Sequence, residues 1–193
     1  MERLGPRGYR RSVFQSYVDE TRRSGFFDEV RARASADLAT GLDNPASTDA
    51  WLGPAYIDEL LSIVAALRGR DGVRELSYQS VKRGGFGAVI EPIIQVSASI
   101  LGAGPGSIFS RAQTMMSVVT RGFEARWSAT SAGGGTLYLR CELPVKEFIW
   151  VAWEGVALWG CDLARVRGLV APARASPDGR SCEIDVSWEP KAS

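Results

Sequence analysis

The hydrophobic pattern of the chain changes its period once, and this change constrains the fold more than any other feature. Up to Gly122, apolar residues recur at helical spacing, as in the segment 57–67. Beyond Gly122 they alternate with polar residues, which is typical of strands with one buried and one solvated face. The alternating segments are 123–130, 136–143 and 181–188. The sequence therefore predicts helices first and an antiparallel sheet second.

The order of the strand segments predicts the fold class. Segments 123–130 and 136–143 form a hairpin that turns at Gly133–Gly135, and 166–173 forms a second hairpin with 181–188. The apolar segment 145–162 between the hairpins is expected to be a helix across the apolar face of the sheet. The predicted class is α+β, with N-terminal helices followed by a ββαββ unit. Its four-stranded antiparallel sheet would have helices packed on one face.

The first half of the chain predicts several helices separated by glycine-rich breaks. Apolar stripes run through 13–18, 27–38 and 57–67, a loop covers 41–54, and Gly69–Gly72 ends the third helix before another at 71–82. A stripe at 86–101 is interrupted by Pro92, and a further helix spans 107–121. We expect residues 1–50 to be a helical arm that could mediate dimerisation. Residues 51–190 would form a single α+β domain resembling ligand-binding domains.

Histidine is absent from the chain, and this absence excludes several classes of site. Without it there is no Ser-His-Asp or Cys-His nucleophile, no histidine-ligated haem, and few of the usual zinc enzyme sites. The three cysteines, Cys141, Cys161 and Cys182, form no CxxC pair and are expected to be buried free thiols. The sequence therefore predicts no catalytic residues, no metal site and no cofactor.

Charge and hydropathy exclude two kinds of partner. The formal net charge is +1, so nothing draws the whole chain toward nucleic acid or an anionic membrane. No apolar run reaches the roughly 18 residues that would span a bilayer, and the N-terminus has no signal-peptide core. We expect a cytoplasmic protein without nucleic-acid binding or membrane insertion.

The segment Glu147–Gly160, EFIWVAWEGVALWG, carries three tryptophans and only two charges. In a helix each residue turns about 100°, so Glu147 and Glu154 would lie within about 20° of each other. Apolar residues cover nearly all of the remaining surface, which predicts a helix buried on more than one face. Glu154, among Trp150 and Trp153, would be either paired with an arginine or a polar anchor inside an apolar pocket.

The helix predicted at 107–121 supplies the other candidate site residues. Met115 and Met116 lie on its apolar face, where they would pack in the core or line a pocket. Arg111 lies on its polar face and is either solvated or an anion contact. The glycine strings GGFG and GAGPG match no nucleotide-binding motif and are interpreted as loops.

The layout over residues 55–190 resembles a known family. The helix SRAQTMMSVVTRGF, the glycine-bearing helix WEGVALWGCDL and the final strand SCEIDVSW resemble a family of paralogous myxobacterial domains of unknown function. The same layout is similar to a wider class that contains 4-vinyl-reductase-type and haem–nitric-oxide-binding domains. Because this chain has no histidine and no clustered Glu/Cys zinc site, the resemblance implies neither haem nor zinc. It implies a sensory domain with an apolar cavity, often dimeric through its N-terminal helices.

Three functions remain as alternatives. The favoured one is a non-enzymatic sensory or regulatory domain that binds a hydrophobic small molecule between helices and sheet. Its pocket would be lined by Trp150, Trp153, Met115, Met116 and Phe123, with Glu154 or Arg111 as the polar anchor. The second is a protein–protein interaction or homodimerisation module without a ligand. The third is an enzyme with an unrecognised site.

Overall fold

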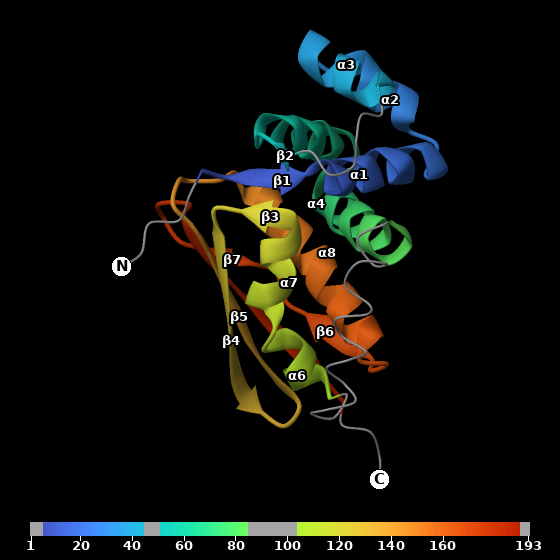
Figure 1. Cartoon of the computed structure of the whole chain (residues 1–193). Helices are drawn as coiled ribbons and strands as arrows, with labels where there is room; N and C mark the ends of the chain where they lie inside the picture. Colours follow the sequence, from blue (N-terminus) through green and yellow to red (C-terminus); the bar gives the residue numbers. More distant parts are fainter. Residues whose placement is uncertain (1–5, 45–50, 85–103, 190–193) are drawn as a thin grey trace.

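A computed structural model describes residues 6–44, 51–84 and 104–189 of the chain (Figure 1). The helices are α1 (Arg11–Arg23), α2 (Phe27–Arg33), α3 (Ala36–Asp43), α4 (Ala55–Arg83), α6 (Pro105–Phe109), α7 (Ala112–Val119) and α8 (Glu147–Leu163). The strands are β1 (Gly8–Arg10), β2 (Trp51–Leu52), β3 (Thr120–Arg121), β4 (Phe123–Ser131), β5 (Gly134–Cys141), β6 (Gly168–Val170), β7 (Arg174–Ala175) and β8 (Ser181–Trp188).

The main sheet is antiparallel, as predicted, but it has five strands instead of four. Its order is β4-β5-β8-β6, and β7 pairs with the same edge of β8. The predicted third strand, 166–173, is shortened to β6, because Pro172 has no backbone N–H with which to continue the ladder, and pairing resumes beyond the predicted segment at β7. The unit is therefore ββαβββ, and the predicted ββαββ layout is wrong in this detail. The first turn is also shorter than expected, because Gly134 and Gly135 already belong to β5.

A second, three-stranded sheet was not predicted. Strand β1 lies between β2 and β3, which pairs Tyr9 with both Leu52 and Thr120. Trp51 on β2 is stacked by two arginines, with the Cζ of Arg10 4.7 Å and that of Arg121 3.7 Å from its ring centroid. This sheet joins the N-terminus to the segment that leads into β4.

The helix predicted from the stripe at 57–67 and the helix predicted at 71–82 form one long helix, α4, with a break inside it. Gly69 has φ of +67°, a conformation that glycine adopts without the steric cost paid by other residues. The break lies within the Gly69–Gly72 stretch where the sequence places a stop. The second segment of α4 packs against α8, and Figure 1 shows this segment (green) between α8 and α1.

The N-terminal stripes are buried within the chain. The second predicted stripe is two helices, α2 and α3, because the extended backbone of Ala34 and Ser35 separates them and Ser35 caps α3. Phe14 of α1, Val30 of α2 and Leu38 of α3 belong to the same buried cluster as Trp150 of α8. The buried residues of these stripes therefore pack within the chain, and the dimerising role of residues 1–50 stays a prediction.

The helix predicted at 107–121 is also divided, into α6 and α7, at Ser110 and Arg111. Helices α7 and α8 lie over one face of the five-stranded sheet, as predicted (Figure 1). The stripe at 86–101 with its expected kink lies outside the described residues. Among the described helices, none is both long and apolar enough to cross a bilayer.

Helix α8 is buried on two faces, as its composition predicts. One face packs on the sheet and the other packs on the second segment of α4. The close approach to α4 depends on Gly155, because a Cβ there would lie 2.3 Å from the carbonyl oxygen of Arg74 and 2.7 Å from the nitrogen of Tyr78. A neighbouring helix of the same chain therefore covers the second face of α8.

Candidate functional site

Two small cavities meet at Trp153 of α8. The first, here the α7 cavity, has a volume of about 40 Å³ and lies between α6, α7 and α8. The second, here the α1 cavity, has a volume of about 50 Å³ and lies between β1, α1, α4 and α8. Trp153 and Val156 line both cavities, so these two side chains form the wall between them.

Apolar side chains form nearly all of the lining of the α7 cavity. Met115 and Met116 of α7 contribute to it, as predicted, together with Trp153. The remaining lining comes from residues that sequence reasoning missed: Ile108, Phe109, Ala112, Leu137, Val156, Ala157, Trp159 and Gly160. No polar or charged side chain contributes to this lining, so the cavity favours an apolar occupant.

Tyr9 lines the α1 cavity together with Ser16, Tyr17, Ser80 and Thr120, and of these five side-chain hydroxyls only that of Tyr9 lacks a hydrogen bond within the described residues. This oxygen is buried and has no hydrogen-bond partner among the described residues, whereas the hydroxyl of Tyr17, in the same lining, donates to Ser77 Oγ at 3.1 Å. Burial raises the pKa of Tyr9 far above its ordinary value, so the phenol is neutral. An unpaired buried hydroxyl costs free energy that a ligand or a water bound there would recover.

The aromatic residues of the predicted pocket pack on one another. The ring of Phe123 lies edge-on to Trp150 at 6.3 Å and to Trp153 at 5.9 Å between centroids. Trp153 borders both cavities, but neither Trp150 nor Phe123 is in their linings. Trp150 is fully buried, and Phe123 contacts both tryptophans.

The two predicted polar anchors lie elsewhere. Arg111 is at the start of α7, and neither it nor Glu154 lines either cavity. Glu154 lies on the α4 side of α8, where it is fully buried. The sequence could not assign a direction to these side chains without the partner helix.

Glu154 is paired with arginine, which was one of the two alternatives. Its Oε1 accepts hydrogen bonds from Arg70 and, at 2.6 Å, from the backbone N–H of Ala173. Its Oε2 lies 4.0 Å from Arg74 Nη1. Arg70 also donates to Glu147 at 2.7 Å, so one guanidinium bridges both glutamates of α8. This arrangement ties α8 to α4 and offers no anchor inside a cavity.

The three cysteines are buried free thiols, as predicted. Burial raises the pKa of Cys161 to about 11 and that of Cys182 to about 12, so both are neutral thiols at physiological pH. Within the described ranges, no three His, Cys, Asp or Glu side chains are grouped so as to hold a metal ion.

Comparison of the fold with solved structures places it beside H-NOX proteins, a haem–nitric-oxide-binding family. The Fe(II) unliganded H-NOX protein from K. algicida aligns with a TM-score of 0.66 and 9% identity, covering 94% of this chain and 97% of that one. A mutant of the T. Tengcongensis H-NOX aligns with a TM-score of 0.64 and 9% identity, covering 94% and 98%. No protein-family model and no curated protein matches the sequence. At this identity the likeness establishes a shared fold.

The interior does not fit a haem. The chain has no histidine to serve as the axial ligand, and the cavities of about 40 and 50 Å³ fall well below the roughly 300 Å³ at which ligand pockets begin. Met116 and Phe123 belong to the main core cluster, and Trp153 packs against it. The histidine argument from the sequence and the packing of the described residues therefore agree.

Proposed function

We propose that this chain is a non-enzymatic sensory or regulatory domain that binds one small, mostly apolar molecule at the wall between the α7 and α1 cavities. The observation that carries the proposal is the pair of cavities separated by Trp153 and Val156. Tyr9, which lines one of them, has a buried hydroxyl without a partner among the described residues. A ligand of this kind would have a hydrocarbon or aromatic body and a single polar atom.

The fold supports the sensory part of the proposal. The solved neighbours include proteins described as H-NOX domains with haem. This chain keeps their fold while its interior lacks room and a histidine for that group. We infer that it recognises its ligand directly, by packing and one hydrogen bond, instead of through a bound iron.

Ligand entry requires Trp153 to move. Each cavity alone is too small for an organic molecule, because an engineered cavity of about 150 Å³ is the size that accepts benzene. Rotation of the Trp153 ring would join the two cavities and expose the Tyr9 hydroxyl to the occupant. Binding would therefore change the surroundings of a tryptophan, which provides a direct signal.

The test uses phenol and benzene as probes of the full chain. We expect phenol to shift the tryptophan fluorescence and raise the melting temperature more than benzene does, because phenol can pair with Tyr9. In the variant Tyr9→Phe, which keeps the ring beside Phe123, the preference for phenol should disappear. Unchanged fluorescence and melting temperature with both probes would refute the proposal.

A second candidate is an interaction module without a ligand, and the small size of the cavities favours it. A homodimer, predicted from the sequence, would use another surface than the stripes of α1 to α3, which are buried within the chain. Light scattering after size-exclusion chromatography distinguishes the candidates: a stable dimer that binds neither probe would support this one.

A further inference from the structure

The segment that joins α2 to α3 presents a serine preceded by two arginines. Ser35 follows Arg33 by two residues and Arg31 by four, and all three residues are exposed. The backbone is extended at Ala34 and Ser35, with ψ of 142° and 165°. Serine kinases that select arginine bind such a segment in extended form and pair its guanidinium groups with carboxylates. The segment therefore has the charge and the backbone shape of a kinase substrate.

The arginines of this segment are accessible to a partner. Arg33 forms no ion pair within the described ranges, and its Nη1 donates to the Glu29 carbonyl oxygen at 3.1 Å. Arg31 pairs with Asp43 at 2.7 Å, but both side chains of this pair are exposed. An exposed pair contributes little free energy, so the carboxylates of an enzyme could replace Asp43.

The tetrapeptide Ala-Arg-Ala-Ser of this segment occurs a second time, at 173–176, in a different environment. Arg174 is paired there with two carboxylates of β8. Ser176 is half-buried, and its Oγ donates to Asp178 at 2.6 Å within a turn. Because the two tetrapeptides are identical, the structure and not the local sequence distinguishes Ser35 from Ser176.

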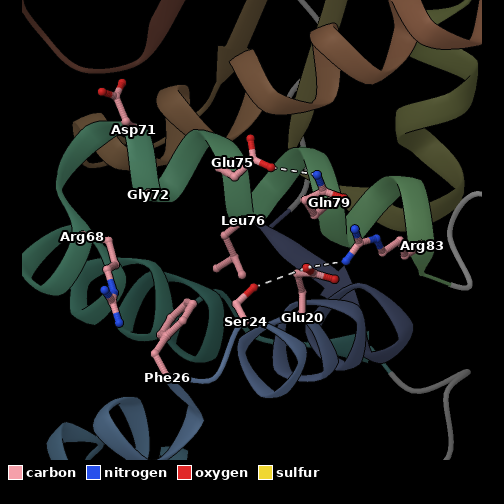
Figure 2. A pocket seen from close by; sticks show the side chains of 10 residues that line it. All are labelled: Glu20, Ser24, Phe26, Arg68, Asp71, Gly72, Glu75, Leu76, Gln79 and Arg83. Carbon is pink, nitrogen blue, oxygen red and sulfur yellow. Dashed lines mark hydrogen bonds and ion pairs between the residues drawn. The ribbon is translucent and has the colours of Figure 1, made fainter.

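Ser24 provides a second comparison, because it also follows arginines. It lies at the cleft of about 560 Å³ between α1 and the second segment of α4, where Figure 2 shows it directed toward Glu20. Its Oγ donates to the buried carboxylate of Glu20 at 3.4 Å. Its backbone is helical, with φ of −81° and ψ of 0°. Ser24 therefore lacks the extended backbone of Ser35.

The hydroxyl of Ser35 joins two helices. Its Oγ accepts a hydrogen bond from the Leu38 backbone N–H at 3.2 Å, which caps α3. The same hydroxyl donates to Oε2 of Glu59 on α4 at 2.9 Å, and the Ser35 backbone N–H donates to Oε1 of that carboxylate at 2.6 Å. A group added to this oxygen would therefore act on the connection between α3 and α4.

We propose that Ser35 is a phosphorylation site and that its phosphate weakens the attachment of α3 to α4. A protein kinase would transfer the terminal phosphoryl group of a nucleoside triphosphate. The Ser35 Oγ forms a bond to the terminal phosphorus, the bond from that phosphorus to the nucleoside diphosphate breaks, and the hydroxyl proton leaves to a base of the kinase.

The added charge acts differently on the two bonds of Ser35. A phosphate of about −1.5 to −2 charge repels the neighbouring carboxylate of Glu59. The same charge is favourable at the N-terminus of α3. Helix α3 therefore stays helical, while its connection to α4 through Glu59 is lost. This proposal does not depend on the ligand proposed for the cavities.

The first test locates the phosphate. The full chain is treated with the catalytic subunit of cyclic-AMP-dependent protein kinase and magnesium ATP, and its peptides are analysed by mass spectrometry. We expect phosphate on Ser35 and at least tenfold less on Ser24 or Ser176. An unmodified Ser35, or equal modification of Ser176, would overturn the proposal.

The second test determines whether Glu59 responds to the charge. Phosphorylation should lower the melting temperature by about 2–4 °C, and this loss should disappear in Glu59→Gln, which carries no opposing charge. Ser35→Asp, which keeps a capping side chain, should reproduce the loss in the native chain but not with Glu59→Gln. Ser35→Asn is the neutral control. An equal loss with and without the Glu59 carboxylate, an equal loss in Ser35→Asn, or no loss at all would overturn the proposed effect.

Discussion

The Cα of Gly155 on α8 lies against the backbone of Arg74 on α4, so close that a Cβ would be 2.3 Å from the Arg74 carbonyl oxygen. This contact allows the second face of α8 to pack closely on α4. The Glu154–Arg70 ion pair joins the two helices at the neighbouring residue. The burial of α8 on both faces therefore depends on the absence of a Cβ at residue 155.

Substituting Gly155 by alanine should reduce the free energy of unfolding by about 2 kcal/mol, because backbone atoms on α4 would have to shift. Gly106 of α6 is the matched control, since a Cβ there would meet nothing within 4 Å. Gly106→Ala should be neutral or slightly stabilising. Urea denaturation of both variants measures the difference, and equal stability would contradict the close-approach argument.

The two glutamates that share Arg70 should differ strongly in their contribution to stability. Glu154→Gln removes a fully buried charge and should cost about 2 kcal/mol, because a buried pair loses one partner. Glu147→Gln removes a carboxylate that is 77% exposed and should cost less than about 0.5 kcal/mol. Chemical denaturation at pH 7 tests both, and a similar cost for the two would show that burial does not determine the effect.

Trp153→Ala should join the two cavities into one. The loss of this large, partly buried side chain should lower the free energy of unfolding by up to about 3 kcal/mol, and benzene should restore part of it by filling the space. Leu60→Ala, a core truncation in the first segment of α4, is the control, because Leu60 is buried but lines neither cavity. Benzene should raise the melting temperature of the first variant only.

Asp185 on β8 should contribute to the acid sensitivity of the sheet. The pKa of Asp185 is lowered, first by the hydrogen bond from Arg174 and then by that from Thr136 at 2.7 Å. A carboxylate with a lowered pKa binds fewer protons in the folded state. Its stabilising effect is therefore present above its ordinary pKa and is lost as the pH falls through the lowered value.

The melting temperatures of the native chain and of Asp185→Asn should therefore converge below about pH 4. Arg174→Met should produce the same convergence, because it removes the main cause of the lowered pKa. Melting curves between pH 7 and pH 2.5 provide the measurement. If the difference in melting temperature between the native chain and Asp185→Asn stayed constant over this pH range, ionisation of Asp185 would not contribute to the acid sensitivity.

The fold could be predicted where it depends on local pattern, and not where it depends on distant pairing. The alternation of Cys182, Ile184 and Val186 with polar residues predicts β8 correctly. The three-stranded sheet escaped prediction because β1, β2 and β3 are only two or three residues long and come from distant parts of the chain. Pro172 was visible in the sequence, but the point at which it interrupts the third strand depends on how that strand pairs with β8.

The candidate site followed the same rule. Met115, Met116 and Trp153 could be placed at a cavity because apolar periodicity gives the buried face of a helix. The side of α8 on which Glu154 finds its partner could not be predicted, because that partner, Arg70, is 84 residues away in the sequence.

The burial of Cys141, Cys161 and Cys182 makes the chain convenient for chemical labelling. An exposed thiolate is the form of cysteine that attacks maleimide reagents, so these neutral, buried thiols should remain unmodified near pH 7 as long as the chain is folded. A cysteine placed at the exposed position Leu143 or Leu169 could therefore carry a single dye in the otherwise native sequence.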